Sequence, residues 1–245
     1  MRGTIIFTLI TAINKEVEKT ESEIVKPTKS VPSYEEYFPR FKKIIAPIEE
    51  TINNRKITFI IKTFNDDNLI IEAITEMNEE RVSKIHELKN ILFNRCKEMI
   101  QQYNPSSFFE EYIFFCISDY DMTDRFVKKK SAVIASLLKD ETAELTQKEI
   151  QETISSQIRY AKNDINIVEW DGAFLLDKEK QFKDTIAILE LANIQLLNLR
   201  ILDNKLQEEL IKIKDITHKA SFMRIFTRSK DLHYLIRVRT KSLLE

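Results

Sequence analysis

Three carboxylates near the single tryptophan are the residues whose types and spacing best suit chemistry. Glu169 and Asp171 flank Trp170, and Asp177 follows a few positions later. Carboxylate oxygens are preferred ligands of Mg²⁺ and Ca²⁺, so a metal-dependent hydrolase with its site near Trp170 is one hypothesis. The alternative is structural, because acidic residues also occupy turns and helix caps, and Asp177 precedes a long predicted helix. We favour the structural interpretation, in which Trp170 is a core anchor or a hinge anchor where the sheet meets the helical arm.

Other catalytic chemistries find little support in the sequence. Only two glycines occur, Gly3 and Gly172, which excludes the P-loop and the glycine-rich dinucleotide-binding turn. His218 and His233 have no Cys or carboxylate at ligand spacing, and His86 lies off the apolar stripe of its helix and is expected to face solvent. Cys96 and Cys116 form no CxxC pair and are expected to be reduced thiols of a cytosolic protein. We therefore name no catalytic residue and no cofactor, with Mg²⁺ as the one candidate ion, and the balance is against an enzyme.

Charge is distributed unevenly along the chain. The net charge is −1, yet residues 218–245 carry seven Lys or Arg against two acids. Such a segment could contact nucleic-acid phosphates, lie near anionic lipid headgroups or form a solvated surface, and nucleic acid is the least favoured of these. No run approaches the roughly 20 apolar residues of a membrane span. The apolar start of the chain is expected to be a strand rather than a signal peptide.

The hydrophobic pattern predicts an α+β (or α/β) fold with a mixed sheet of about five to seven strands flanked by helices. The expected strands cover residues 4–14, 55–64, 68–74, 110–118, 156–161, 165–169 and 173–176. The expected helices cover residues 34–52, 79–102, 123–138, 146–154 and 179–217. Period two in the first strand predicts that it is half-buried. We predict a domain at 1–177 and a helical arm at 178–245, formed by the long helix and a basic C-terminal helix.

The apolar pattern of the long helix changes along its length. Its first half, up to about residue 202, has a stripe that should pack on the sheet, formed by Phe182, Ile186, Leu189, Ala192 and Leu196 and widened by Leu191, Ile194 and Ile201. Its second half keeps a narrow seam at heptad-like spacing, interrupted by Asp203: Leu199, Leu206, Leu210 and Ile213. A narrow seam is typical of a helix that pairs with another helix. The partner is either the basic C-terminal helix of the same chain or a second copy; a long solvated helix is the third alternative.

Four polar residues lie close to the wide stripe: Glu190, Asn193, Gln195 and Arg200. Where such groups are buried they must be hydrogen-bonded, and they would then fix the register of the helix against the sheet. Arg200 is also a candidate binding residue together with the acidic group around Trp170. A ligand role for the other three is the less favoured alternative.

One region resembles a known family. The residues that carry the likeness are Tyr160, Asp164, Glu169-Trp170-Asp171, Ala173, Asp177, the segment LELANIQLL from Leu189 to Leu197, and Arg200. Residues 110–205 resemble an uncharacterised family of prokaryotic membrane-associated proteins, which implies a cytosolic α/β domain, long helices and a C-terminal hydrophobic hairpin. The layout is also similar to the soluble part of CorA-type divalent-cation channels, although their pore signature is missing and a shared layout does not imply a shared function.

These observations favour a non-catalytic cytosolic domain of a membrane-associated assembly. The long helix would mediate self-association or link the domain to a membrane segment, and a CorA-like relation to divalent cations is one version of this hypothesis. The expected location is the cytoplasm, at the cytoplasmic face of a membrane if the basic tail contacts lipid. The alternatives are the hydrolase near Trp170 and nucleic-acid binding through the tail.

Overall fold

The computed structural model describes residues 1–13, 21–24, 40–43, 46–78, 81–159, 161 and 163–222. Met1–Leu197 form one compact unit and Asn198–Glu245 a second. The start of the helix predicted at 34–52, Tyr160 of the family resemblance and the basic tail beyond residue 222 lie outside the described residues. The domain boundary expected at residue 177 concerns independent folding and stays a prediction.

The first unit is organised around one mixed sheet. Its strands are β1 (Gly3–Ile13), β2 (Glu21–Ile24), β3 (Arg40–Lys43), β4 (Ile48–Ile52), β5 (Arg55–Phe64), β6 (Asn68–Met77), β7 (Pro105–Ile117), β8 (Gln157–Ile158), β9 (Asp164–Val168) and β10 (Gly172–Asp177). Their order is β2-β3-β5-β6-β1-β7-β10-β9-β8, with β4 also paired to β5. Neighbours are antiparallel except β7 and β10, which are parallel. The N-terminal strand β1 therefore lies near the centre of the sheet.

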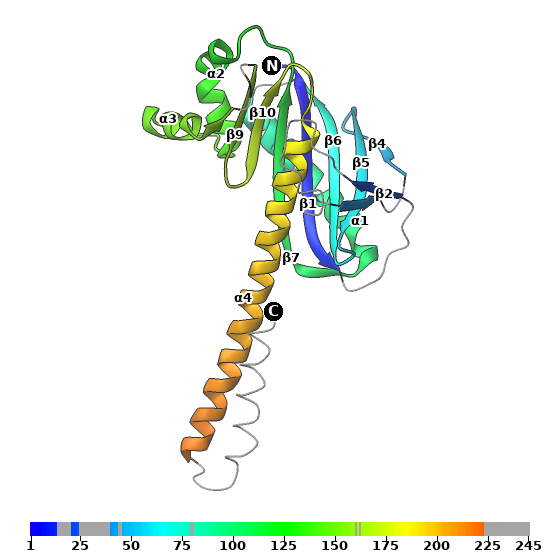
Figure 1. Cartoon of the computed structure of the whole chain (residues 1–245), viewed down its shortest axis with the longest axis vertical. Helices are drawn as coiled ribbons and strands as arrows, with labels where there is room; N and C mark the ends of the chain where they lie inside the picture. The colour runs from blue at the N-terminus through cyan, green and yellow to red at the C-terminus, as the bar shows by residue number, and fades with distance from the viewer. Residues whose placement is uncertain are drawn as a thin grey trace. The chain divides into compact units, whose positions relative to one another are not determined.

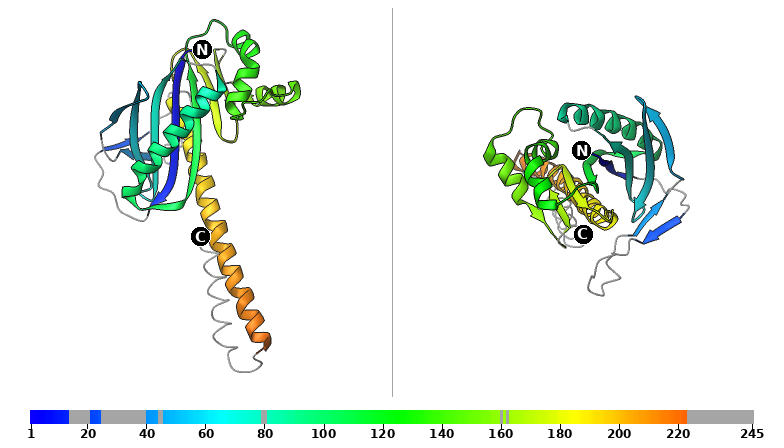
Figure 2. Two further views of the ribbon diagram at one scale, coloured as in Figure 1. Left: turned by 180° about the vertical axis from the view of Figure 1, so that it is seen from behind. Right: turned by 90° about the horizontal axis from the view of Figure 1, so that it is seen from above.

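Helices cover both faces of this sheet. They are α1 (Val82–Ile100), followed by the short 3-10 helix η2 (Gln101–Tyr103), then α2 (Thr123–Leu138), α3 (Gln147–Ser155) and α4 (Lys183–Phe222). Figures 1 and 2 show α1 and the start of α4 on opposite faces of β1. The α+β class and the mixed sheet flanked by helices are confirmed. The strands outnumber the expected five to seven because β2, β3 and β4 are only four or five residues long, too short for a periodic signal.

Strand β1 is buried on both faces. Ile5, Phe7 and Leu9 join the large core cluster that contains residues of α1 and α2. Thr8 and Ile10 point to the opposite face and are also buried. The expectation of a half-buried strand is thus wrong, because α4 covers the side that alternation assigned to solvent.

The segment before β5 differs from the prediction. A helix was expected at residues 34–52, but its described part forms β3 and β4. Both strands pair with the free edge of β5, so tertiary pairing overrides the local pattern. Asn53 and Asn54 join β4 to β5 with φ of 51° and 62°, the left-handed pair that a two-residue hairpin turn requires. Strands β5 and β6, which were expected at 55–64 and 68–74, pair with each other as an antiparallel hairpin.

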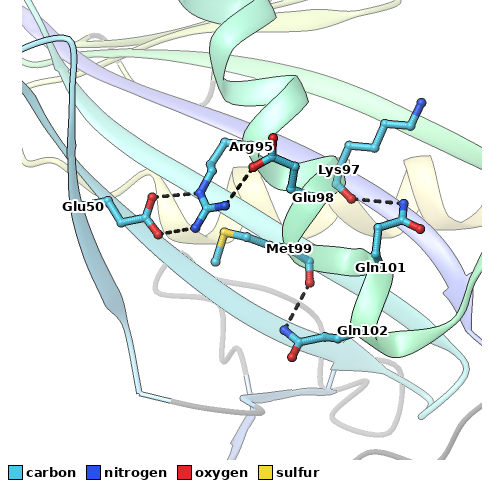
Figure 3. A network of polar contacts seen from close by, with 7 residues as sticks. All are labelled: Glu50, Arg95, Lys97, Glu98, Met99, Gln101 and Gln102. Carbon is cyan, nitrogen blue, oxygen red and sulfur yellow. Dashed lines mark hydrogen bonds and ion pairs between the residues drawn. The ribbon is translucent and has the colours of Figure 1, made fainter.

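The remaining helices match their sequence signals. The inner face of α1 is apolar, and its last turns are tied to β4 by Arg95, whose Nε and Nη2 donate to the two carboxylate oxygens of Glu50 at 2.8 and 2.6 Å. Figure 3 shows this fork together with Glu98. Helix α2 has the bounds that were predicted. Helix α3 matches the expected range 146–154 to within one residue and is capped by Thr146, whose Oγ1 accepts from the backbone N–H of Glu149.

Candidate functional site

Trp170 lies in the turn between β9 and β10 and is 71% exposed. It is therefore no core anchor, and that expectation is wrong. The turn is held by backbone groups of its neighbours: Tyr112 Oη donates to the carbonyl of Glu169 at 2.9 Å, and Ile113 N–H donates to the carbonyl of Asp171 at 3.1 Å. The indole is left facing solvent because the tight turn buries its backbone and not its side chains.

Asp177 is at the opposite end of β10 from Trp170. Its Oδ1 accepts from the backbone N–H of Glu179 at 2.8 Å, so it caps the turn after β10. It does not cap α4 as predicted, because that helix begins only at Lys183. Arg200 is exposed and belongs to the second unit.

The predicted binding residues are thus not assembled into one site within the first unit. Across the described ranges, no group of three or more His, Cys, Asp or Glu is arranged to hold a metal ion. Both cysteines are free and buried, and burial raises the pKa of each thiol to about 12, which leaves them unreactive.

A buried ionic cluster lies instead beneath the first half of α4. Lys62 Nζ of β5 donates to Glu72 Oε1 of β6 at 2.5 Å and to Glu190 Oε2 of α4 at 2.6 Å. All three residues are buried, Glu190 completely. Its burial with a partner confirms the expectation that a buried polar group on this helix is hydrogen-bonded. Asn193 is also buried and bonded, but it donates to the carbonyl of Leu189 within the same helix, and Gln195 is exposed. That these groups fix the register of the helix stays a prediction.

Electrostatics define what this cluster can do, and we call it the Lys62 cluster. Burial alone would lower the pKa of Lys62, but the charges of Glu190 and Glu72 and their hydrogen bonds outweigh it and raise that pKa. Lys62 is therefore a permanent cation and no nucleophile or base. Burial raises the pKa of Glu190, Lys62 lowers it and Glu72 raises it, and the net pKa is about 8.

A small hollow of about 230 Å³ adjoins the Lys62 cluster. Its remaining walls are mainly apolar: Ile6, Phe41, Ile60, Ile74, Lys183, Ile186 and Ala187. The ring of Phe41 lies 4.6 Å from Lys62 Nζ, close enough for a cation–π contact. Oε1 of Glu190 has no hydrogen-bond partner among the described residues. The hollow thus brings a carboxyl oxygen of unmet hydrogen-bonding capacity next to apolar walls.

A larger cleft of about 820 Å³ lies where the parallel strands β7 and β10 end. Its walls combine both signs of charge, from Arg2, Glu76, Asp119 and Lys180. Lys180 has a φ of 59°, a left-handed conformation that a lysine seldom adopts. The place matches the general position of ligand sites at the carboxyl ends of parallel strands, but the mixed charges single out no ligand class.

The face of α4 that meets the sheet overlaps the predicted stripe in part. Ile186 and Ile194 are buried as expected, together with Ala187, Glu190 and Leu197, whereas Leu189, Leu191 and Leu196 are half-buried and Ala192 is exposed. The buried face includes Glu190 because a fully buried carboxyl group needs a partner such as Lys62.

The predicted seam lies in the second unit. Leu199, Leu206 and Leu210 are 62, 40 and 63% exposed, and Ile213 is partly exposed. Side-chain hydrogen bonds run along the helix beside them, such as Gln207 Nε2 to Asp203 Oδ2 at 2.7 Å. The seam is therefore a set of large apolar side chains on an otherwise charged helix.

By length and composition, Lys183–Lys214 could cross a membrane, and it is the one such segment among the described residues. The sequence pattern had predicted no membrane-spanning segment. A third of its most apolar window is buried inside the protein, and Glu190 within it is paired with Lys62. Core helices of water-soluble proteins pass the same test, so this observation is weak support for a membrane location.

Comparison with known proteins supplies a family. Residues 57–183 match the profile described as "Uncharacterized protein MJ0711, N-terminal domain". The chain is also 30% identical over 239 residues to "Uncharacterized protein MJ0711" of Methanocaldococcus jannaschii, covering 97% of this chain and 72% of that protein. The chain belongs to the MJ0711 N-terminal domain family. No solved structure matches it.

Family membership confirms the coarse part of the resemblance, an uncharacterised family. The MJ0711 description names neither a membrane nor a cation channel, so membrane association and the CorA likeness stay predictions. The matched segment contains Lys62 and Glu72 and ends before Glu190.

Sequence reasoning singled out Glu190 but missed Lys62 and Glu72. The available signal was a lone charge inside each of two apolar strands, in FIIKTF and LIIEAI. Such a charge faces solvent in most half-buried strands. A lone charge in a strand indicates an internal ion pair only when both faces of the sheet are buried.

Proposed function

We propose that this chain is a non-catalytic assembly module, in which the second half of α4 pairs with the same helix of a second copy. The observation that carries this proposal is the exposed seam Leu199, Leu206, Leu210 and Ile213. Exposed leucines spaced by seven and four positions on a charged helix are the requirement for a two-helix coiled coil.

Charge flanking the seam favours a second copy in parallel register. With Leu206 at a d position and Leu210 at an a position, Glu209 falls at g and Lys214 at e. In a parallel pair each g residue lies near the e residue five positions later on the other helix, so Glu209 and Lys214 attract. Asp203 lies at an a position, where it would face Asp203 of the second copy, and the repulsion between these two charges limits the affinity of the dimer.

Sedimentation equilibrium of the full chain tests the proposal. We expect a concentration-dependent dimer that is lost in the double variant Leu206→Glu/Leu210→Glu. Ile211→Glu is the matched control, because Ile211 is 60% exposed on the same turn but lies off the seam; it should dimerise like the wild type. Leu206→Cys should form a disulfide between copies if the register is parallel. A wild-type chain that stays monomeric at every concentration refutes the proposal, and leaves the chain's own residues 223–245 as the occupant.

A location at the cytoplasmic face of a membrane is the second part of the proposal. It is supported by the length and composition of Lys183–Lys214 and by the basic composition of residues 218–245. Flotation with vesicles containing anionic lipid tests it. Binding that disappears on deletion of residues 223–245 supports this part, and no binding to anionic vesicles at low salt removes it.

The CorA-like version rests only on the layout of an α/β body continuing into a long helix. It requires Mg²⁺ to stabilise the fold. An unchanged melting temperature on adding millimolar Mg²⁺ would remove it, together with the rival hydrolase that needs a metal at Glu169 and Asp171. Nucleic-acid binding through the basic tail is the remaining rival, and salt-sensitive binding that depends on residues 218–245 would favour it.

A further inference from the structure

The cleft at the ends of β7 and β10 is built by four neighbouring strands. Strand β1 begins at this edge of the sheet, and β6, β7 and β10 end there, because β1 is antiparallel to β6 and β7 while β10 is parallel to β7. Figure 1 shows the N-terminus at the same edge. Residues directly before or after these strands therefore converge on one hollow of about 820 Å³. Small-molecule sites commonly have volumes of about 300–1,000 Å³.

Each of the four strand ends contributes one charged side chain to the cleft. The cations are Arg2 before β1 and Lys180 after β10, and the anions are Glu76 in the last turn of β6 and Asp119 after β7. All four residues are exposed. Within the described ranges, none of these four side chains forms an ion pair, either with another member of the group or with a residue outside it.

This lack of pairing narrows the ligand class. Mixed charge alone indicates no class, because opposite charges in one cleft usually neutralise each other. Here two cations and two anions are held apart on four different strand ends. A ligand with a single charge would satisfy one pair and leave the other pair facing a like charge or none. A ligand that carries both signs can satisfy all four.

The backbone of Lys180 also indicates a role for its side chain. Its φ of 59° lies in the left-handed region, and the other non-glycine residues with positive φ in the described structure are all Asn or Asp, which tolerate that region better. A tied turn holds it there: its N–H donates to the carbonyl of Asp177 at 3.2 Å, and Asp177 Oδ1 accepts from Glu179 N–H at 2.8 Å. Glycine would fit this position at lower cost, and such strained residues cluster at ligand sites.

The cleft has an apolar wall beside these charges. Ile6 of β1 and Phe182, directly before α4, both line it and are half-buried. Both pack against the small core cluster on this face of the sheet, so the wall is fixed in place. Apolar walls with a few fixed polar groups are typical of small-molecule sites.

We propose that this cleft binds a zwitterionic ligand of the amino-acid class, an amino acid or a dipeptide. The two cations bind its carboxylate, the two anions bind its ammonium group, and the apolar wall contacts its side chain. Charge-assisted hydrogen bonds of this kind are the strong ones in proteins. The site lies wholly within the first unit, so it does not depend on pairing of the second half of α4.

Ligand-observed NMR titration of the full chain tests the proposal, with a chain that has no N-terminal tag because Arg2 lines the cleft. The probes are the standard amino acids and a set of dipeptides, added singly at millimolar concentration. We expect saturable binding of at least one of them. Its N-acetyl derivative keeps only the carboxylate and its methyl ester keeps only the ammonium group. Each should bind at least about tenfold more weakly, because each loses charge-assisted hydrogen bonds.

Two variants assign the binding to this cleft. Lys180→Gly removes the ammonium group and places glycine where the backbone is left-handed, so the fold should be retained. Asp119→Asn removes one of the anions without a change in size. Each variant should lower the affinity by about tenfold or more. The matched controls Lys129→Gln and Glu144→Gln alter exposed charges outside the cleft and should bind like the wild type.

Three results would overturn the proposal. The first is the absence of binding by every probe. The second is a singly charged derivative that binds as tightly as its parent, since the site would then not require both charges. The third is equal affinity of Lys180→Gly and the wild type, because the ligand would then bind elsewhere on the protein.

Discussion

Replacing Lys62 by Met tests the Lys62 cluster most directly. The substitution keeps a long unbranched side chain of similar shape and removes only the ammonium group. Two buried charge-assisted hydrogen bonds are lost, to Glu72 and Glu190, as well as the contact with the ring of Phe41. Both carboxyl groups are then left in the interior without a cation.

The expected magnitude follows from these contacts. Each charge-assisted bond is worth about 1.5–3 kcal/mol, and removal of one partner from a buried ion pair costs about 3–5 kcal/mol. We therefore expect the free energy of unfolding at neutral pH to fall by about 3–5 kcal/mol. For a chain of this size that corresponds to a melting temperature lower by about 6–20 °C. The loss should shrink at acid pH, because both carboxyls of the variant then take up protons.

Urea unfolding followed by circular dichroism measures the effect, with Lys56→Met as the matched control. Lys56 lies on the same strand β5 and forms an ion pair with Glu49 at 2.9 Å, but its side chain is 69% exposed. Exposed pairs contribute about 0–1 kcal/mol. Equal losses in Lys62→Met and Lys56→Met would refute the reasoning, since the two ion pairs of Lys62 are buried and the single ion pair of Lys56 is exposed.

Three further expectations follow from the fold. Gly3→Ala should destabilise the protein by about 1–3 kcal/mol, because the added Cβ would lie 2.4 Å from the carbonyl oxygen of Cys116 and from Cδ1 of Ile117; a variant as stable as wild type in thermal unfolding would contradict that close approach. Thr146→Ala removes the cap of α3 and should cost about 1 kcal/mol by urea unfolding, with no change counting against the capping bond. Trp170 should have solvent-like fluorescence that iodide quenches readily in the native state, and a shielded, blue-shifted emission would show that its exposure is wrong.

Long, regular elements were predictable from the sequence. Strong periodic patterns mark strands β5, β6 and β7 and helices α1 and α2. Helix α3 begins directly after its N-cap residue, Thr146. The short strands at the sheet edge could not be predicted from the sequence, because β3 and β4 form only by pairing with β5. The local hydrophobic pattern of a segment does not show which strand it will pair with.

The candidate site was harder to predict than the fold. Glu190 was noticed as a polar residue beside an apolar stripe, but its partner Lys62 is 128 positions away. The Trp170 group failed for the opposite reason. Its residues are close in sequence, yet an extended strand between Asp171 and Asp177 carries them to opposite ends of β10. Proximity along a strand therefore argues against a shared site.

The central position of β1 bears on how the chain reaches its native state during synthesis. This apolar segment leaves the ribosome before both of its partner strands, and Thr8 Oγ1 donates to the carbonyl of Tyr112, 104 positions later. At about 5–20 residues per second, β1 waits several seconds for β7. One edge of β1 can pair with β6 earlier, but the other edge stays open to other nascent chains until β7 is made. The central strand of the finished sheet is thus exposed to wrong pairing during translation.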